Sequence, residues 1–239
     1  MPIVNRISAY HDDMREWRRD IHKHPELAYN EHRTASKVAE LLKTFGVDEI
    51  VEGIGGTGLV GVIRNGEGGS IGLRADMDAL PITEDTGVPY TSVNEGVMHA
   101  CGHDGHTTML LGAAKYLAET KNFSGTVVLI FQPAEEGGAG ADAMIKDGLF
   151  EKFPVETVWG MHNMPTIPVG KFITRVGPFM ASCDTVDVTV NGVGGHGAMP
   201  HFSRSPVNAA CAIIQALSDF VALEINTQNP CTYTVGNIH

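Results

Sequence analysis

The chain has 239 residues, of which 43% are hydrophobic and 19% are charged, an ordinary balance for a globular protein of one large domain or two smaller ones. Seventeen Lys and Arg against 28 Asp and Glu give a formal charge of -11, and there is no basic block. This charge argues against binding to nucleic acid or to anionic membrane surfaces, so the expected partner is a small molecule.

The N-terminus and the cysteines indicate a cytoplasmic protein. The opening MPIVNRISAYHDDMREWRRD becomes charged within a few residues and lacks the apolar core of a signal peptide, and no run approaches a membrane span. We therefore expect no membrane partner and a reducing compartment. The four cysteines are widely spaced and form no CxxC pair, which makes a disulfide framework a poor interpretation. They are Cys101, Cys183, Cys211 and Cys231.

Two helices are predicted at the start of the chain. In the first, apolar residues recur in alternating steps of four and three, which places them on one stripe of an amphipathic helix. The second is predicted to begin near Asn30, a good N-cap, and to end at Gly46. The stripe of the first helix consists of Ile3, Ile7, Tyr10, Met14, Trp17 and Ile21.

Strands and helices then alternate. Helical patterns cover about 106–118 and 140–146, and short apolar runs between turn residues predict strands. This alternation indicates βαβ units, so the predicted fold class is α/β, with a mostly parallel sheet flanked by helices. The predicted strands are 59–63, 71–75, 126–131 and 157–161.

The sequence changes character near residue 177. Alternating polar and apolar residues lead into the glycine-rich GGHGAMPH, a helix follows with Pro206 in its first turn, and TYTV is predicted to be another strand. We therefore divide the chain into a larger domain, residues 1–177, and the start of a smaller α+β domain inserted into it, residues 178–239.

Side chains that bind metals occur in three separate motifs. Two precede a predicted helix, whose N-terminal amides favour a thiolate, and the others follow predicted strands. Ligands bind at the carboxyl ends of strands in open α/β sheets, so we expect these side chains to converge. They are Cys101 and His103 in MHACGHDGHT, Glu135 and Glu136 in FQPAEEGG, and His162 in WGMHNMP.

The mixture of thiolate, imidazole and carboxylate suits a borderline divalent cation such as zinc, with cobalt, nickel or manganese as alternatives. Asp76 and Asp78 follow the strand that ends near residue 75 and reach the same edge, although either could merely cap a turn. Ordinary structural roles exist for the other residues too: a buried cysteine, a solvated helix start and a core histidine. The convergence of independent segments favours hydrolytic metal chemistry.

With these motifs laid out, the chain resembles the N-acyl amino acid amidohydrolase family. That family includes hippurate hydrolases and plant auxin-conjugate hydrolases, and it is related to aminoacylases and carboxypeptidase G-type metallopeptidases. The resemblance covers essentially the whole chain. It is carried, in order, by RRDIHKHPELAYNE, GLRADMDALPI, MHACGHDGHT, GTVVLIFQPAEEGGAGA, GMHNMP and GGHGAMPH.

The resemblance implies two divalent metal ions and a general base. Glu135 is implied to be the base and later the acid, which agrees with the chemistry, because a divalent metal lowers the pKa of water and a nearby carboxylate takes its proton. The implied metal ligands are Cys101, His103, Glu136 and His162.

Two further residues acquire roles by resemblance. Asp78 resembles a carboxylate that orients a metal ligand. His196, in GGHGAMPH, resembles a histidine of the smaller domain that polarises the scissile carbonyl or binds the substrate carboxylate, often across a dimer. A homo-oligomer formed through the smaller domain is therefore implied.

Family members are longer than this chain. Their smaller domain continues past a VGxIxGG stretch, begun here at Val235, and their chain then returns to the catalytic domain and supplies another histidine ligand. The resemblance therefore implies that this chain is truncated at its C-terminus and lacks one ligand.

The leading hypothesis is metal-dependent hydrolysis of the amide bond of N-acyl or N-aroyl amino acids. A metallo-dipeptidase or carboxypeptidase of the same superfamily is an alternative. A second is a cysteine hydrolase with Cys101 as nucleophile and His103 or His106 as base. A third is a non-catalytic form that keeps the metal site as a binding or assembly module.

Overall fold

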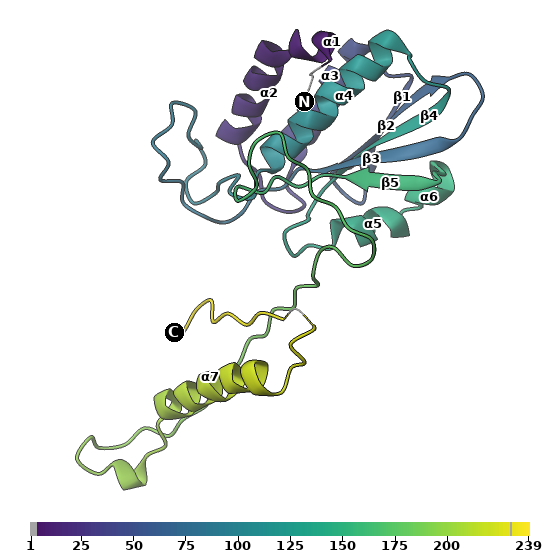
Figure 1. Ribbon diagram of the computed structural model, residues 1–239. Helices are drawn as coiled ribbons and strands as arrows, with labels where there is room; N and C mark the ends of the chain where they lie inside the picture. Colours follow the sequence, from purple (N-terminus) through teal and green to yellow (C-terminus); the bar gives the residue numbers. More distant parts are fainter. Residues whose placement is uncertain (1–3, 230) are drawn as a thin grey trace. The chain divides into compact units, whose positions relative to one another are not determined.

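The computed structural model describes residues 4–229 and 231–239 (Figure 1). The described residues belong to two compact units, which meet between Gly170 and Lys171 in the sequence. The predicted stripe residue Ile3 lies outside the described residues. The first unit has three layers, with a sheet between two sets of helices, and its strands run in the order β1-β2-β4-β3-β5. The strands are β1 (Glu49–Ile54), β2 (Gly58–Asn65), β3 (Ser70–Asp76), β4 (Gly125–Gln132) and β5 (Thr157–Gly160).

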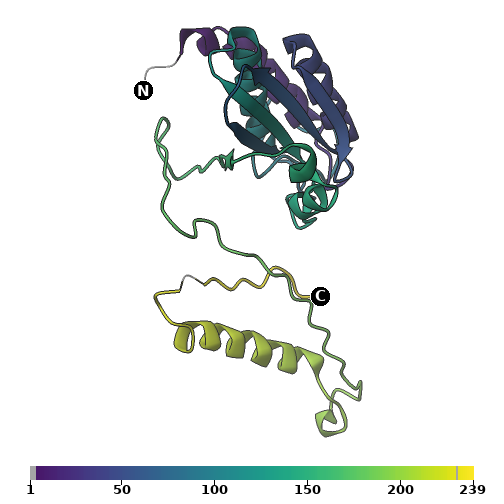
Figure 2. The same ribbon diagram turned by 90° about the vertical axis from the view of Figure 1, so that its right-hand side faces the viewer.

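The helices cover both faces of this sheet. Helices α3 and α4 pack on one face, with α2 against α4, and α5 and α6 cover the other face (Figures 1 and 2). The helices of this unit are α1 (Asn5–Ser8), α2 (His11–Lys23), α3 (His32–Phe45), α4 (His103–Thr120), α5 (Gly140–Lys146) and α6 (Leu149–Lys152).

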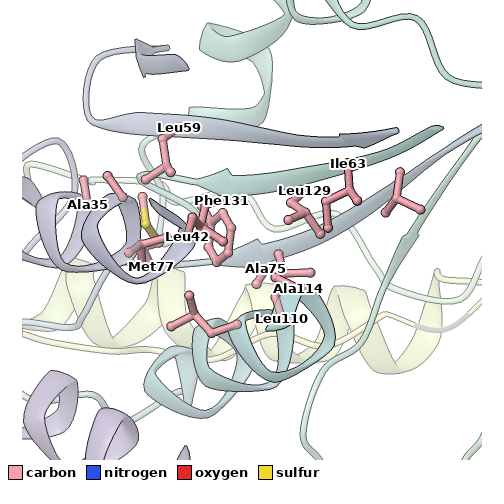
Figure 3. Close-up of a cluster of buried hydrophobic side chains, with 14 residues drawn as sticks. Ala35, Leu42, Leu59, Ile63, Ala75, Met77, Leu110, Ala114, Leu129 and Phe131 are labelled. Carbon is pink, nitrogen blue, oxygen red and sulfur yellow. The ribbon is translucent and has the colours of Figure 1, made fainter. Parts of the chain in front are cut away.

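The core follows from the alternation of side chains along the strands. On β4, Leu129 and Phe131 point toward α3 and α4, whereas Val128 and Ile130 join the cluster on the α5 and α6 side. Figure 3 shows the larger cluster, in which Leu129 and Phe131 meet side chains of α3 and α4. The middle of β4, VVLIF at 127–131, is buried on both faces, as its uninterrupted apolar run predicts.

The predicted α/β class is confirmed, but the sheet expected to be mostly parallel is mixed, because β1 and β2 form an antiparallel hairpin whose second strand pairs antiparallel with β4. β3 pairs parallel with β4 and β5, whereas β2 pairs antiparallel with β1 and β4. The strand β1 was not predicted, because its sequence EIVEGI interrupts the apolar run with acidic residues and glycine. The predicted first helix is divided at Ala9 and Tyr10 into α1 and α2, and the second helix begins at His32 with Gly46 as its left-handed C-cap, φ 77°.

The second unit contains the helix α7 (Pro206–Leu223) and the short 3₁₀ helix η1 (Pro200–Phe202). Ser205 caps α7 by accepting a hydrogen bond from the amide of Asn208. The strands expected around GGHGAMPH and at TYTV are wrong for the described residues, which form only an isolated bridge between Val193 and Arg204. A strand needs a paired neighbour to satisfy its backbone groups, and the described part of this unit provides none.

Helix α7 also corrects the expectation that no segment approaches a membrane span. Its 18 residues are long and apolar enough to cross a membrane by length and composition alone. One helix of this length and composition is only weak evidence for a membrane span, because the core helix of a soluble protein can be equally long and apolar.

Candidate metal centre

The predicted metal ligands of the first unit lie at one edge of the sheet. β3, β4 and β5 run parallel, so their carboxyl ends are neighbours. Asp76 ends β3, the turn with Glu135 and Glu136 follows β4, and His162 lies two residues after β5. The sequence argument that placed these segments together is therefore confirmed for the described chain.

Two further candidates are placed by the start of α4. Gly102 is the N-cap of this helix, with φ 91°, and it separates Cys101 from His103. A Cβ atom at Gly102 would come within 2.5 Å of the Asn163 side chain. Only glycine combines this left-handed backbone with so close an approach, so the turn that presents Cys101 and His103 depends on it.

His103 lies at the centre of the site. Its side chain is 0% exposed, and its Nε2 lies 3.8 Å from Glu135 Oε2 and 3.7 Å from Glu136 Oε1. The same nitrogen lies 3.7 Å from Asp76 Oδ2, and Nδ1 lies 3.3 Å from Asp78 Oδ1. Carboxylates from two different segments therefore surround one imidazole.

The thiol and the second histidine complete the arrangement. Cys101 Sγ lies 3.3 Å from His162 Nε2. Three groups of side chains each bring their ligand atoms within 4.8 Å of one another, and His103 belongs to all three. They are Cys101, His103 and His162; Asp76, His103 and His106; and His103, Glu135 and Glu136.

Asp76 and Asp78 hold neighbouring parts of the site in place. Asp78 Oδ2 accepts a hydrogen bond from the amide of Glu136 at 2.8 Å. Asp76 Oδ1 lies 2.6 Å from His106 Nδ1, and His106 Nε2 accepts from the backbone amide of Asn163 at 3.0 Å. An ionised carboxylate can only accept, so His106 Nδ1 donates to Asp76, while Nε2 also faces the side-chain oxygen of Asn163.

Charge pairing keeps both aspartates ionised. Burial alone would raise the pKa of Asp76, but the hydrogen bond from His106 and the charge of Arg74 lower it to about 2. Burial also opposes ionisation of Asp78, whose pKa is lowered below its usual value by His103 and by backbone amides. Conversely, burial tends to lower the pKa of His103, and these aspartates raise it overall.

The protein side chains around Cys101 do not by themselves favour the expected thiolate. Burial raises the pKa of this thiol to about 12, with further contributions from Glu136 and Glu135. A cysteine nucleophile needs a depressed pKa, so these surroundings disfavour the cysteine hydrolase alternative.

The donor atoms fit a divalent cation. Glu136 Oε1 and both ring nitrogens of His103 are buried without a hydrogen-bond partner among the described residues. Such atoms are costly to leave unsatisfied, and a cation would satisfy Glu136 and one nitrogen of His103. A coordinated cation also deprotonates a thiol, which would reverse the raised pKa of Cys101.

A second buried cluster supports the start of α4. His22 Nδ1 lies 2.9 Å from Asp104 Oδ2, its Nε2 lies 3.1 Å from Glu84 Oε1, and Arg18 donates to Asp104 at 3.0 Å. The hydrogen bond to Asp104 raises the pKa of His22 despite burial. The cluster thereby joins α2 to the residue that follows His103.

His196, the remaining predicted residue, belongs to the second unit. It is exposed, and its Nδ1 accepts a hydrogen bond from the amide of Ala198 at 3.2 Å. Its part in the site stays a prediction. Two residues beside the predicted ligands, His106 and Asn163, had no predicted place in the metal site. The three-residue spacing of His106 from His103 on α4 was the available signal.

Comparison with known proteins identifies similar chains. The model of peptidase family M20/M25/M40 matches residues 72–235. Hippurate hydrolase of Campylobacter jejuni is 49% identical over 237 residues, which cover 99% of this chain and 61% of that protein. Thermostable carboxypeptidase 1 of Saccharolobus solfataricus is 42% identical over 248 residues, covering 100% of this chain and 62% of that protein.

A solved structure also matches. A dinuclear metal-binding peptidase of the M20 family from Bacillus subtilis is 42% identical, with a TM-score of 0.64, and the match covers 68% of this chain and 46% of that one. This chain spans about three fifths of the length of the two curated relatives, 61% and 62%.

Proposed function

The chain belongs to peptidase family M20/M25/M40, and from this premise we propose that the protein is a metal-dependent amidohydrolase. Its reaction is hydrolysis of the amide bond of an N-acyl or N-aroyl amino acid to a carboxylate and a free amino acid. The observation that carries the proposal is the meeting of three groups of ligand atoms at His103. The similarity to a hippurate hydrolase supports the substrate class.

Four residues are proposed to hold two divalent ions: Cys101, His103, Glu136 and His162. Bound ions would supply Lewis acidity, which lowers the pKa of water and polarises a carbonyl. Zinc, manganese, cobalt and nickel are all compatible with this donor set. Asp78, 3.3 Å from His103 Nδ1, is proposed to orient that imidazole.

Glu135 is proposed to be the general base and then the general acid. Its side chain is 39% exposed, against 22% for Glu136, so it can meet a water and a substrate. Its carboxylate takes a proton from the attacking water as the new C–O bond forms, and it returns the proton to the amide nitrogen as the C–N bond breaks. In this proposal Glu136 binds metal and its neighbour Glu135 transfers the proton.

Residues 178–239, within the second unit, are proposed to belong to a satellite domain that follows a catalytic domain of residues 1–177. Within it, His196 is proposed to stabilise the developing oxyanion or to bind the substrate carboxylate. Assembly into a homo-oligomer through this domain and a cytoplasmic location are further parts of the proposal.

A carboxypeptidase that acts on peptides is the second candidate. The 42% identity to a thermostable carboxypeptidase favours it, and the chemistry at the amide bond would be the same. A non-catalytic binding module is the third candidate, and it predicts metal binding without turnover.

Chelation tests the metal dependence. With hippurate and N-acetyl amino acids as substrates, we expect a chelator to abolish turnover and added zinc, manganese, cobalt or nickel to restore it. We expect an alkylating agent to leave turnover of the metal-loaded protein largely unchanged, because bound metal would protect Cys101. Turnover that resists the chelator but is lost on alkylation would contradict the proposal and favour a cysteine nucleophile.

A further inference from the structure

Glu31 is a carboxylate without contact to solvent. It immediately precedes α3 and is 0% exposed. Its Oε1 accepts a hydrogen bond from the backbone amide of Ala134 at 2.8 Å, and its Oε2 accepts one from the hydroxyl of Thr57. A carboxylate is costly to bury, so a site that fixes both oxygens calls for an explanation.

Glu31 stabilises the backbone conformation at Ala134 by accepting a hydrogen bond from its amide. Ala134 is buried and has φ 49°, in the left-handed region that residues other than glycine rarely adopt. Its carbonyl accepts from the amide of Gly140 at 3.0 Å, and its own amide has Glu31 as acceptor. Without Glu31 this buried amide would be unsatisfied at the residue where the chain turns toward Glu135.

Two other contacts hold the same turn farther along. Asp78 accepts from the amide of Glu136 at 2.8 Å, and the hydroxyl of Tyr29 donates to the carbonyl of Gly138 at 2.5 Å. Tyr29 lies two residues before Glu31, so one short segment contacts the turn on both sides of its glutamates. Of these three contacts, only the one from Glu31 acts before Glu135.

We propose that Glu31 is a positioning residue of the metal centre, which sets the direction of Glu135 and Glu136 by fixing the amide of Ala134. The inference rests on the proposed function, in which one glutamate binds metal and the other moves a proton. A rotation of the backbone at Ala134 displaces both side chains at once. Thr57 contributes by holding the second oxygen of Glu31.

Three variants separate positioning from general stability. Glu31→Gln keeps an oxygen that accepts from Ala134, and its NH₂ group can donate to the oxygen of Thr57. Glu31→Leu has a similar volume and no acceptor. Glu40→Leu makes the same change at an exposed glutamate of α3 and is the matched control.

The first readout is amide hydrogen exchange of the metal-free protein. For Glu31→Leu we expect exchange at Ala134, Glu135 and Glu136 to be about tenfold faster, since one hydrogen bond is lost. We expect the amides of α3 and β4 to keep their parental rates, and Glu31→Gln and Glu40→Leu to resemble the parent throughout.

The second readout is the affinity for cobalt(II) together with its visible absorption. A residue that orients a ligand typically contributes about tenfold to a hundredfold in metal affinity, so Glu31→Leu should weaken cobalt binding by that factor and alter the spectrum. Glu31→Gln should restore both.

Unchanged exchange at the turn in Glu31→Leu would overturn the proposal, as would equal acceleration in α3 and β4. If Glu31→Leu fails to fold, Thr57→Val takes its place and should accelerate exchange at the same three amides to a smaller extent; no change would overturn the proposal. A parent protein that binds no cobalt contradicts the proposed function, whereas the exchange data still decide the role of Glu31.

Discussion

Replacing Glu135 with glutamine is expected to lower kcat by about a hundredfold to ten-thousandfold, the usual contribution of a general acid–base residue. Glutamine keeps the size of the side chain and a hydrogen bond to water, but it cannot take a proton. Glu135 is the more exposed of the two glutamates, at 39%, so the change should leave the surrounding packing intact.

Metal content distinguishes loss of the base from loss of the site. Elemental analysis of Glu135→Gln should give the same metal content as the parent protein, with kcat reduced and KM little changed. Glu151→Gln, at an exposed position of α6, is the control and should match the parent in both measurements. A kcat of Glu135→Gln close to that of the parent protein, with metals still bound, would exclude Glu135 as the base.

Replacing His103 with alanine is expected to weaken metal binding by more than about a hundredfold, because loss of a residue that only supports a ligand already costs about tenfold to a hundredfold. His103 is the one residue common to all three groups of ligand atoms among the described residues. Its removal also leaves Asp76, Asp78 and Glu136 facing one another without the imidazole between them.

Titration of metal-free protein with zinc measures this effect. The matched control is His32→Ala, at an exposed histidine of α3, which should bind zinc as the parent does. If His103→Ala bound zinc with the affinity of the parent protein, His103 would not be a zinc ligand. We expect turnover to fall together with metal content in this variant, in contrast to Glu135→Gln.

The sequence predicted β2, β3, β4 and β5 from short apolar runs between turn residues. β2 and β4 appear as continuous apolar runs because neither face meets water. The edge strand β1 was missed because glutamates and a glycine interrupt its apolar run, whereas the exposed edge strand β5 was predicted. The break between α1 and α2 at Tyr10 accompanies tertiary contacts, in which the Tyr10 hydroxyl donates to Glu119 and Lys115 lies 4.4 Å from the centre of its ring.

The candidate site was predictable where it depended on strand ends and local motifs. Cys101, His103 and the two glutamates each lie in a short motif beside a predicted element, and parallel pairing brings those elements together. Contacts between distant segments were not predictable. Glu31 and Ala134 are 103 positions apart, and a glutamate before a helix gives no sign that it is buried.

In the second unit, the sequence pattern was not sufficient to predict strands. Alternation predicted strands there, but alternation describes a strand only when a neighbouring strand satisfies its backbone. Within the described residues of this unit, Val193 and Arg204 form the only bridge. Helix α7, predicted from its start at Pro206, did form, because helical hydrogen bonds are local.

Metal content and hydrolysis measured together on this 239-residue chain provide the most direct test. The protein would be loaded with zinc, manganese, cobalt or nickel, analysed for metal, and assayed with hippurate and N-acetyl amino acids. We predict close to two metal ions per chain and release of the free amino acid. Less than one metal ion per chain, with no hydrolysis of any of these substrates, would contradict the proposed metal centre and the activity assigned to it.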